Sequence, residues 1–96
     1  MIVSLDSNGS ILLHDARNFR AFSFLASGKD LPSDGADVLF RDDHAWVSLG
    51  SLRTYPDLAG DAEWQTGLDA MVDFAQAKGW VDASGKRLRA QIERAE

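Results

Sequence analysis

Residues 61–80 of this 96-residue chain have the sequence DAEWQTGLDAMVDFAQAKGW, the strongest structural signal in the protein. Apolar residues recur in it at intervals of three and four: Trp64, Leu68, Met71, Val72 and Ala75. Such spacing places the apolar side chains along one face of a helix. The pattern therefore predicts an amphipathic helix over about 61–78.

Both ends of this helix carry capping residues. Asp61 can accept hydrogen bonds from the free N–H groups of the first turn. Gly79 can take the left-handed conformation that ends a helix, and Trp80 can then fold back onto the last turn. Gly67 lies within the apolar face, where glycine costs ~1 kcal/mol relative to alanine. We therefore expect a strand to approach the helix closely at Gly67.

The first half of the chain predicts β-strands. Residues 2–5 and 11–14 flank Asn8-Gly9, a dipeptide typical of a type I′ hairpin turn, in which both central residues have positive φ. Residues 36–41 and 45–49 form a second predicted hairpin around Asp42, Asp43 and His44. Residues 50–57 are expected to be an irregular connection, because Pro56 interrupts regular structure.

Two segments are ambiguous. Residues 19–26 could form a helix capped by Asp15, or a strand over 20–26 that follows a turn at 15–18. The Phe-rich composition favours the strand. In residues 86–96, Leu88, Ala90 and Ile92 alternate with polar residues as in a strand, but the individual propensities favour helix. We expect a short helix there.

These elements predict a single α+β domain over residues 1–96. It would contain an antiparallel sheet of about four or five strands, built from two hairpins, with the long helix packed on one face and a short C-terminal segment. The predicted strands carry apolar groups on both sides, since Val38 opposes Leu39 and Val47 opposes Trp46. A sheet with one wet face alternates more cleanly. The second face therefore needs a cover, which could be the C-terminal segment, a second copy of the chain, or a ligand.

Composition constrains the location of the protein. Hydrophobic residues make up 45% and charged residues 26%, as in ordinary globular domains. No apolar run approaches the ~20 residues that cross a bilayer, and the N-terminal residues lack the pattern of a signal peptide. The chain has no cysteine, which excludes disulfides and thiolate metal sites. A bacterial-type cytoplasmic location fits best.

The net charge of −5 argues against nucleic-acid and membrane partners. A protein that binds phosphates normally presents a broad basic face. Here the basic residues gather only near the end of the sequence, at Lys86, Arg87, Arg89 and Arg94. We interpret this cluster as a solvated segment that balances the acidic helix.

Four residues are candidates for acid–base chemistry. His14 and His44 are the side chains whose ordinary pKa lies near neutrality, and Asp42 and Asp43 precede His44, as a carboxylate that orients a general base can. Each also has a plain role in a turn or at a strand end. If the two hairpins stacked side by side, these groups could bind a divalent cation, but their spacing is looser than that of metal-ligand clusters. No nucleophile elbow or phosphate-binding glycine pattern occurs, so the sequence predicts no metal and no cofactor.

The aromatic residues are candidates for binding. Trp46, Trp80 and Tyr55, together with Arg53, belong to the residue types enriched in binding sites. They are also ordinary core anchors in a small domain, and Trp46 is the strongest candidate for an exception.

Two hypotheses of function follow. The first is a non-catalytic interaction module, a homodimer or an accessory subunit that docks through its spare apolar sheet face on another protein. The alternative is a small cofactor-free enzyme or a small-molecule-binding domain with a pocket between helix and sheet. The lack of catalytic signatures favours the first.

Overall fold

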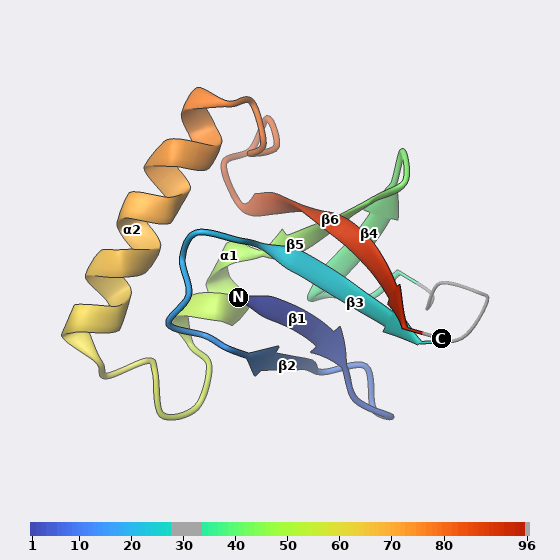
Figure 1. Cartoon of the computed structure of the whole chain (residues 1–96), viewed down its shortest axis with the longest axis horizontal. Coiled ribbons are helices and arrows are strands. Elements are labelled where there is room, and N and C mark those ends of the chain that lie inside the picture. Colours follow the sequence, from blue (N-terminus) through green and yellow to red (C-terminus); the bar gives the residue numbers. More distant parts are fainter. Residues whose placement is uncertain (28–33, 96) are drawn as a thin grey trace.

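The computed structural model describes residues 1–27 and 34–95, which form a curled six-stranded sheet with one long helix (Figure 1). The elements, in chain order, are β1 (Ile2–Leu5), β2 (Ile11–His14), β3 (Ser23–Ser27), β4 (Val38–Arg41), β5 (His44–Ser48), α1 (Leu49–Arg53), α2 (Ala62–Ala77) and β6 (Arg87–Ala95). The α+β class predicted from the sequence is confirmed. The details of the sheet differ from the prediction.

The sheet is mixed, with the strand order β2-β1-β3-β6-β5-β4. Both predicted hairpins are present, as the antiparallel pairs β1–β2 and β4–β5. They lie at opposite ends of the sheet, and the central strands β3 and β6 join them. β3 pairs in parallel with both β1 and β6, so the predicted purely antiparallel sheet of four to five strands is corrected to six strands of mixed direction.

The prediction of a C-terminal helix was wrong. Residues 87–95 form the central strand β6, which pairs with β5 on one side and with β3 on the other. Two neighbouring strands provide β6 with backbone hydrogen bonds along both edges, and this tertiary pairing outweighs a helix preference of a few tenths of a kcal/mol per residue. The alternation of Leu88, Ala90 and Ile92 with polar residues was the correct signal.

The other ambiguous segment is a strand, as the Phe-rich composition favoured. β3 begins at Ser23, three residues later than the start expected at residue 20. A turn precedes it, in which Asp15 has positive φ and the Asn18 N–H donates to the Asp15 carbonyl at 3.0 Å. Leu49, expected to end a strand, and residues 50–53, expected to be irregular, form the short helix α1, and Ser48 caps it by accepting a hydrogen bond from the Ser51 N–H.

The two hairpins use different turns from those predicted. In the first, Gly9 has positive φ, Asn8 does not, and the Asp6 side chain accepts hydrogen bonds from the N–H groups of Asn8 and Ser10. In the second, Asp42 and Asp43 both have positive φ, at 54° and 63°. The type I′ geometry expected at Asn8-Gly9 therefore occurs at Asp42-Asp43, between the paired residues of β4 and β5.

Helix α2 confirms the prediction made from residues 61–80. The Asp61 side chain accepts a hydrogen bond from the Trp64 N–H at 3.0 Å, which caps the first turn. At the other end Gly79 has a φ of 78°, and the Trp80 N–H donates to the Ala75 carbonyl at 2.8 Å. This is the Schellman arrangement of a helix C-terminus.

Gly67 does permit a close approach, but to a loop and not to a strand. A Cβ atom added at Gly67 would lie 2.4 Å from Cε2 of Phe19, whose ring also packs against Trp64. The absence of a side chain at Gly67 thus lets the segment before β3 pack directly on the helix.

The core lies on the concave side of the curled sheet. The inward residues of the central strands are almost fully buried, as Ala45, Val47, Leu88 and Ala90 show, with 0–1% exposure. The ring centroids of Phe24 on β3 and Phe40 on β4 are 5.2 Å apart, although two strands separate β3 from β4. Such a contact across the concave side requires the sheet to curl.

The two helices complete the enclosure of the core. Leu52 of α1 and Trp64 and Leu68 of α2 are each 0% exposed within the same cluster. α2 lies along the end of the sheet at which β1, β3 and β6 begin (Figure 1). The curl and both helices therefore cover the inner face together, and the outer face of the sheet remains to be described.

Candidate functional site

The two histidines lie on one face of the sheet but far apart. His44 pairs with Gln91, Gln91 with Ser23, Ser23 with Ile2, and Ile2 with His14. Four inter-strand steps separate the histidines, on the order of 19 Å. The hairpins are therefore not side by side, which was the condition for a shared cation. Among residues 1–27 and 34–95, no group of three or more His, Asp or Glu residues could hold a metal ion.

Each histidine has a local partner. His44 Nδ1 lies 2.9 Å from the carbonyl oxygen of Asp42, and His14 Nε2 lies 3.2 Å from Ser4 Oγ. Asp42 and Asp43 form the turn between β4 and β5. The carboxylate-to-imidazole contact that would orient a general base is missing at both histidines within the described part of the chain.

Two of the binding candidates, Tyr55 and Arg53, make structural contacts. Tyr55 Oη accepts a hydrogen bond from the Leu13 N–H at 3.2 Å, on the outer edge of β2. Arg53 forms an ion pair with Asp69 of α2 at 2.6 Å. Arg53, the last residue of α1, thus connects α1 to α2, and Tyr55 connects the segment after α1 to β2. Trp46 lies on the outer face of β5, opposite Leu39 on β4.

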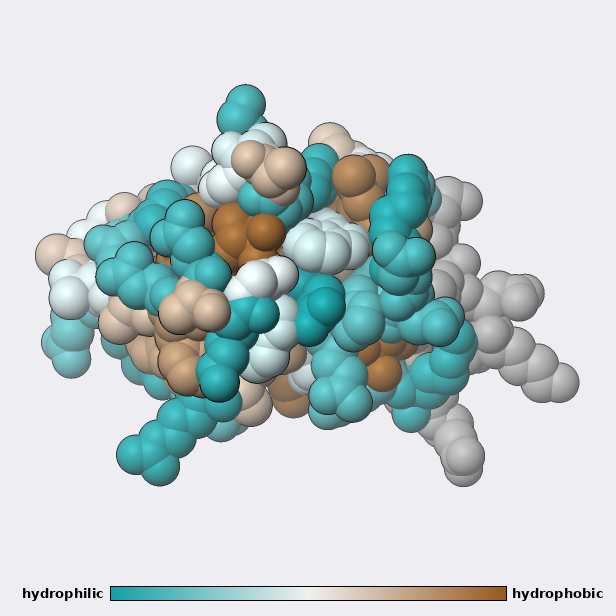
Figure 2. Space-filling model, turned by 90° about the horizontal axis from the view of Figure 1, so that it is seen from above, coloured by the Kyte–Doolittle hydropathy of each residue, from teal (hydrophilic) through white to brown (hydrophobic). Residues whose placement is uncertain are grey.

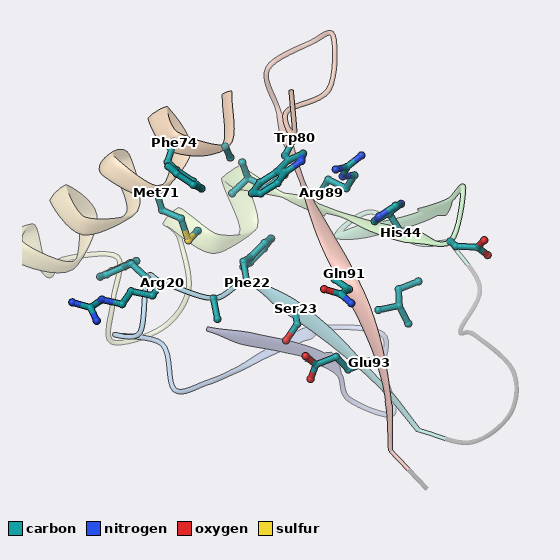
Figure 3. Close-up of a pocket in the computed structure, with 16 residues that line it drawn as sticks. Arg20, Phe22, Ser23, His44, Met71, Phe74, Trp80, Arg89, Gln91 and Glu93 are labelled. Carbon is teal, nitrogen blue, oxygen red and sulfur yellow. The ribbon is translucent and has the colours of Figure 1, made fainter. Parts of the chain in front are cut away.

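A groove of about 600 Å³ opens between α2 and the outer side of β6 (Figure 3). On the β3 side of β6, the first half of the strand has an isolated bridge, from Leu88 to Val81, and the second half pairs with β3 from Gln91 onward. The groove lies where the partner of β6 changes. Its volume is in the range of sites for small organic ligands.

The helix side of the groove is apolar. Phe74 and Met71 of α2 reach into it, with Trp80 and Phe22 nearby (Figure 3). Phe74 is 58% exposed, and its ring lies edge-on to Trp80 with the centroids 5.9 Å apart. The Phe74 ring therefore contributes apolar surface to the helix side of the groove, beside Trp80.

The sheet side of the groove is polar. Arg89, Gln91 and Glu93 follow one another along the outer face of β6 (Figure 3), and Ser23 of β3 pairs with Gln91. The Arg89 guanidinium lies over the Trp80 ring, 5.7 Å from its centroid. Seen from above, the surface around this region is largely hydrophilic, with small apolar patches between the polar side chains (Figure 2).

The groove unites only part of the residues selected from the sequence. Three of them line it: Trp80, His44 and Asp43. The remaining five lie outside its lining: His14, Asp42, Trp46, Arg53 and Tyr55.

Sequence reasoning missed the other side chains of the groove, above all Phe74, Ser23, Arg89, Gln91 and Glu93. The last three were hidden by the expectation of a C-terminal helix. Read as a strand, residues 87–95 place every second side chain on one face, and that alternation was the available signal.

The comparisons with known proteins add no family: neither a family model, a curated protein nor a solved structure matches this chain. In the described part of the chain, no helix combines the length and apolar character needed to cross a membrane. The groove itself is therefore the basis for proposing a function.

Proposed function

We propose that this chain is a non-catalytic binding domain that holds the apolar part of a small organic ligand in the groove between α2 and β6. The observation that supports it most is Phe74, which is 58% exposed although it belongs to the helix that closes the core. Phe74 and Trp80 form an aromatic corner, and ligand sites combine such apolar walls with a few convergent polar groups.

The polar groups of the groove favour binding over catalysis. The described contact of the His44 ring is to a backbone carbonyl, that of Asp42, and not to a carboxylate or a nucleophile. General-base catalysis usually needs a third group that orients the histidine. We therefore assign the groove a binding role and no chemical step.

A neutral fluorescent probe, N-phenyl-1-naphthylamine, tests this function. We expect its fluorescence to rise on binding to the native protein, and we expect Phe74→Ala to weaken the binding at least fivefold. Leu12→Ala is the matched control, because Leu12 is the other exposed large hydrophobic residue among those described, at 37%, and lies on β2. Equal binding by both variants would show that the probe does not bind at the aromatic corner.

A second candidate function is association with a second copy or with an accessory partner protein through the outer sheet face. Trp46 and Leu39 lie opposite each other there, on β5 and β4, and both are half-buried. An aromatic residue beside a branched aliphatic one is a plausible centre for a contact, since aromatic residues are enriched at interfaces.

The hydrogen bonds along the edge of β4 favour association through the outer face of the sheet over pairing of two chains edge to edge. The Phe40 N–H donates to Asp34 Oδ1 at 2.8 Å, and the Arg41 guanidinium donates to the Phe40 carbonyl at 2.7 Å. The hydrogen bond from Phe40 and the one from Arg41 lower the pKa of the Asp34 carboxyl, which keeps the acceptor charged. An edge whose groups are already bonded cannot add a strand.

Sedimentation equilibrium of the native protein and of Trp46→Ser tests the association. We expect a dimer that Trp46→Ser dissociates. A strict monomer at high protein concentration would contradict the homodimer and leave an accessory partner as the form to test, by crosslinking in cells. We also propose a cytoplasmic location, supported by the absence of cysteine from the sequence, and cell fractionation checks it.

A further inference from the structure

The Arg89 guanidinium in the groove forms no ion pair with a described residue. Arg89 is half-buried and its guanidinium lies over the Trp80 ring. No described carboxylate is within ion-pair distance of it, whereas Arg17, Arg41 and Arg53 each pair with an aspartate. A guanidinium has five N–H donors, and stacking on a ring leaves those donors free in its plane. Arg89 therefore presents unused donors to the groove.

Ser23 supplies a second unused polar group. Its residue is 7% exposed, it lines the groove, and its hydroxyl forms no hydrogen bond with the described residues. Among the described residues, no fully buried side-chain oxygen lacks a partner, so the Ser23 oxygen is accessible from the groove and its hydroxyl can donate to a ligand there. This observation is independent of the charge on Arg89.

The two groups can reach one acceptor group. Ser23 is opposite Gln91, and Arg89 precedes Gln91 by two residues on the same face of β6. Their Cα atoms are thus about 8 Å apart along the sheet, a distance that an arginine side chain spans. The aromatic corner of Phe74 and Trp80 adjoins Arg89.

We infer that the ligand of the groove is an aromatic carboxylate. Its carboxylate accepts two hydrogen bonds from the Arg89 guanidinium and one from the Ser23 hydroxyl, while its ring packs against Phe74 and Trp80. The inference depends on the binding function proposed above and adds the charge and the planarity of the ligand. Bidentate pairing with a carboxylate is the geometry that favours arginine over lysine.

Glu93 fixes the direction in which the ligand lies. It is four residues from Arg89 on the same face of β6, about 13 Å along the strand. Ser23 is opposite Gln91, midway between Arg89 and Glu93. A carboxylate held by Arg89 and Ser23 therefore lies farther from Glu93 than one at the Glu93 end of the groove, which Glu93 would repel more strongly.

The test compares naphthalene-2-carboxylate with naphthalene-2-carboxamide, which has the same ring and no charge. Both are titrated against bound N-phenyl-1-naphthylamine at pH 7 and low salt. We expect the carboxylate to bind at least tenfold more tightly than the amide. Arg89→Met should lower the affinity for the carboxylate at least tenfold and the affinity for the amide less than twofold. Arg89→Lys should retain only part of the affinity for the carboxylate.

Two control variants make the result specific to Arg89. Lys86→Met removes one positive charge from the same basic segment outside the groove, and it should leave both affinities unchanged. Arg20→Met removes the other arginine that lines the groove. A loss of carboxylate affinity in Arg20→Met and not in Arg89→Met would overturn the assignment to Arg89.

The outcomes separate the two proposals. If the carboxylate and the amide displace the probe with equal affinity, the proposal of an aromatic carboxylate ligand is overturned, but the proposed binding function is not. Failure of the probe itself to bind overturns both. If Arg89→Met does not fold, an NMR titration of the native protein takes the place of this variant. We expect the side-chain Nε–H resonance of Arg89 to shift on addition of the carboxylate and not on addition of the amide.

Discussion

The inner and outer faces of β5 and β6 share one backbone and serve different purposes. On the inner face, Ala45, Val47, Leu88 and Ala90 are 0–1% exposed and meet only other apolar groups. On the outer face, most of the intervening residues are charged or polar, with Trp46 as an exception on β5, and several of them line the groove. The side chains of a strand alternate between the two faces of its sheet. A single register therefore places the core residues on the inner face and the groove residues on the outer face.

The largest expected difference between the faces is in stability. Leu88→Ala removes a side chain that is 1% exposed, so we expect the free energy of unfolding to fall by about 2–5 kcal/mol. Gln91→Ala, three residues along the same strand and on the outer face, should change it by less than about 0.5 kcal/mol. Urea denaturation measures both. Similar losses in the two variants would show that the outer face is part of the core.

Gly67 tests whether the inner contacts extend to the loop before β3. Gly67→Ala gains about 1 kcal/mol of helix propensity, but its Cβ would lie 2.4 Å from the Phe19 ring. We expect a net loss of about 1–3 kcal/mol, since overpacking forces side chains out of their rotamers. Adding Phe19→Leu should recover part of it. A stabilised Gly67→Ala would mean that the Phe19 ring does not pack on α2.

The sequence predicted those parts of the inner face that local patterns determine. α2 was predicted with its caps because periodicity, Asp61 and Gly79 all lie within one segment. Both hairpins were predicted because their strands are neighbours in the sequence. The parallel pairing of β3 with β1 and β6 joins segments distant in sequence, and no local signal specifies it.

The groove was harder to predict because it depends on that distant pairing. Ser23 and Gln91 are 68 positions apart in the numbering and become neighbours only through the β3–β6 register. Arg89 gains its role from Trp80, which follows α2 and returns alongside β6. A correct assignment of residues 87–95 as a strand would have placed Arg89, Gln91 and Glu93 on one face, but not the helix beside them.

The turn between β4 and β5 offers a smaller, stabilising test. Asp42 and Asp43 both have positive φ, a conformation that Asn and Gly adopt at lower cost. Replacing the pair with Asn-Gly should raise the free energy of unfolding by about 0.5–1 kcal/mol, seen as a higher Tm. Asn8→Gly is the matched control, because Asn8 lacks positive φ, and it should not stabilise. Stabilisation by Asn8→Gly alone would contradict the assignment of the two turns.

The smallest effect concerns the pH dependence of the α2 cap, Asp61, which is half-buried at the surface, in contrast to the core. The hydrogen bond from the Trp64 N–H and the one from Arg17 lower the pKa of the Asp61 carboxyl. Because its folded pKa lies below its unfolded value of about 3.9, the carboxylate stabilises the fold fully above that value. This contribution is lost as the pH falls through the folded pKa.

Asp61→Asn isolates this contribution, because asparagine still caps the helix but does not titrate. We expect Asp61→Asn to be less stable than the native protein at pH 6, and the difference to shrink as the pH falls below about 4. Glu63→Gln removes a carboxylate from the same turn that does not cap the helix, so its effect should be smaller. A difference between native protein and Asp61→Asn that stays constant from neutral to acid pH would mean that the Asp61 carboxylate is not stabilised by its contacts.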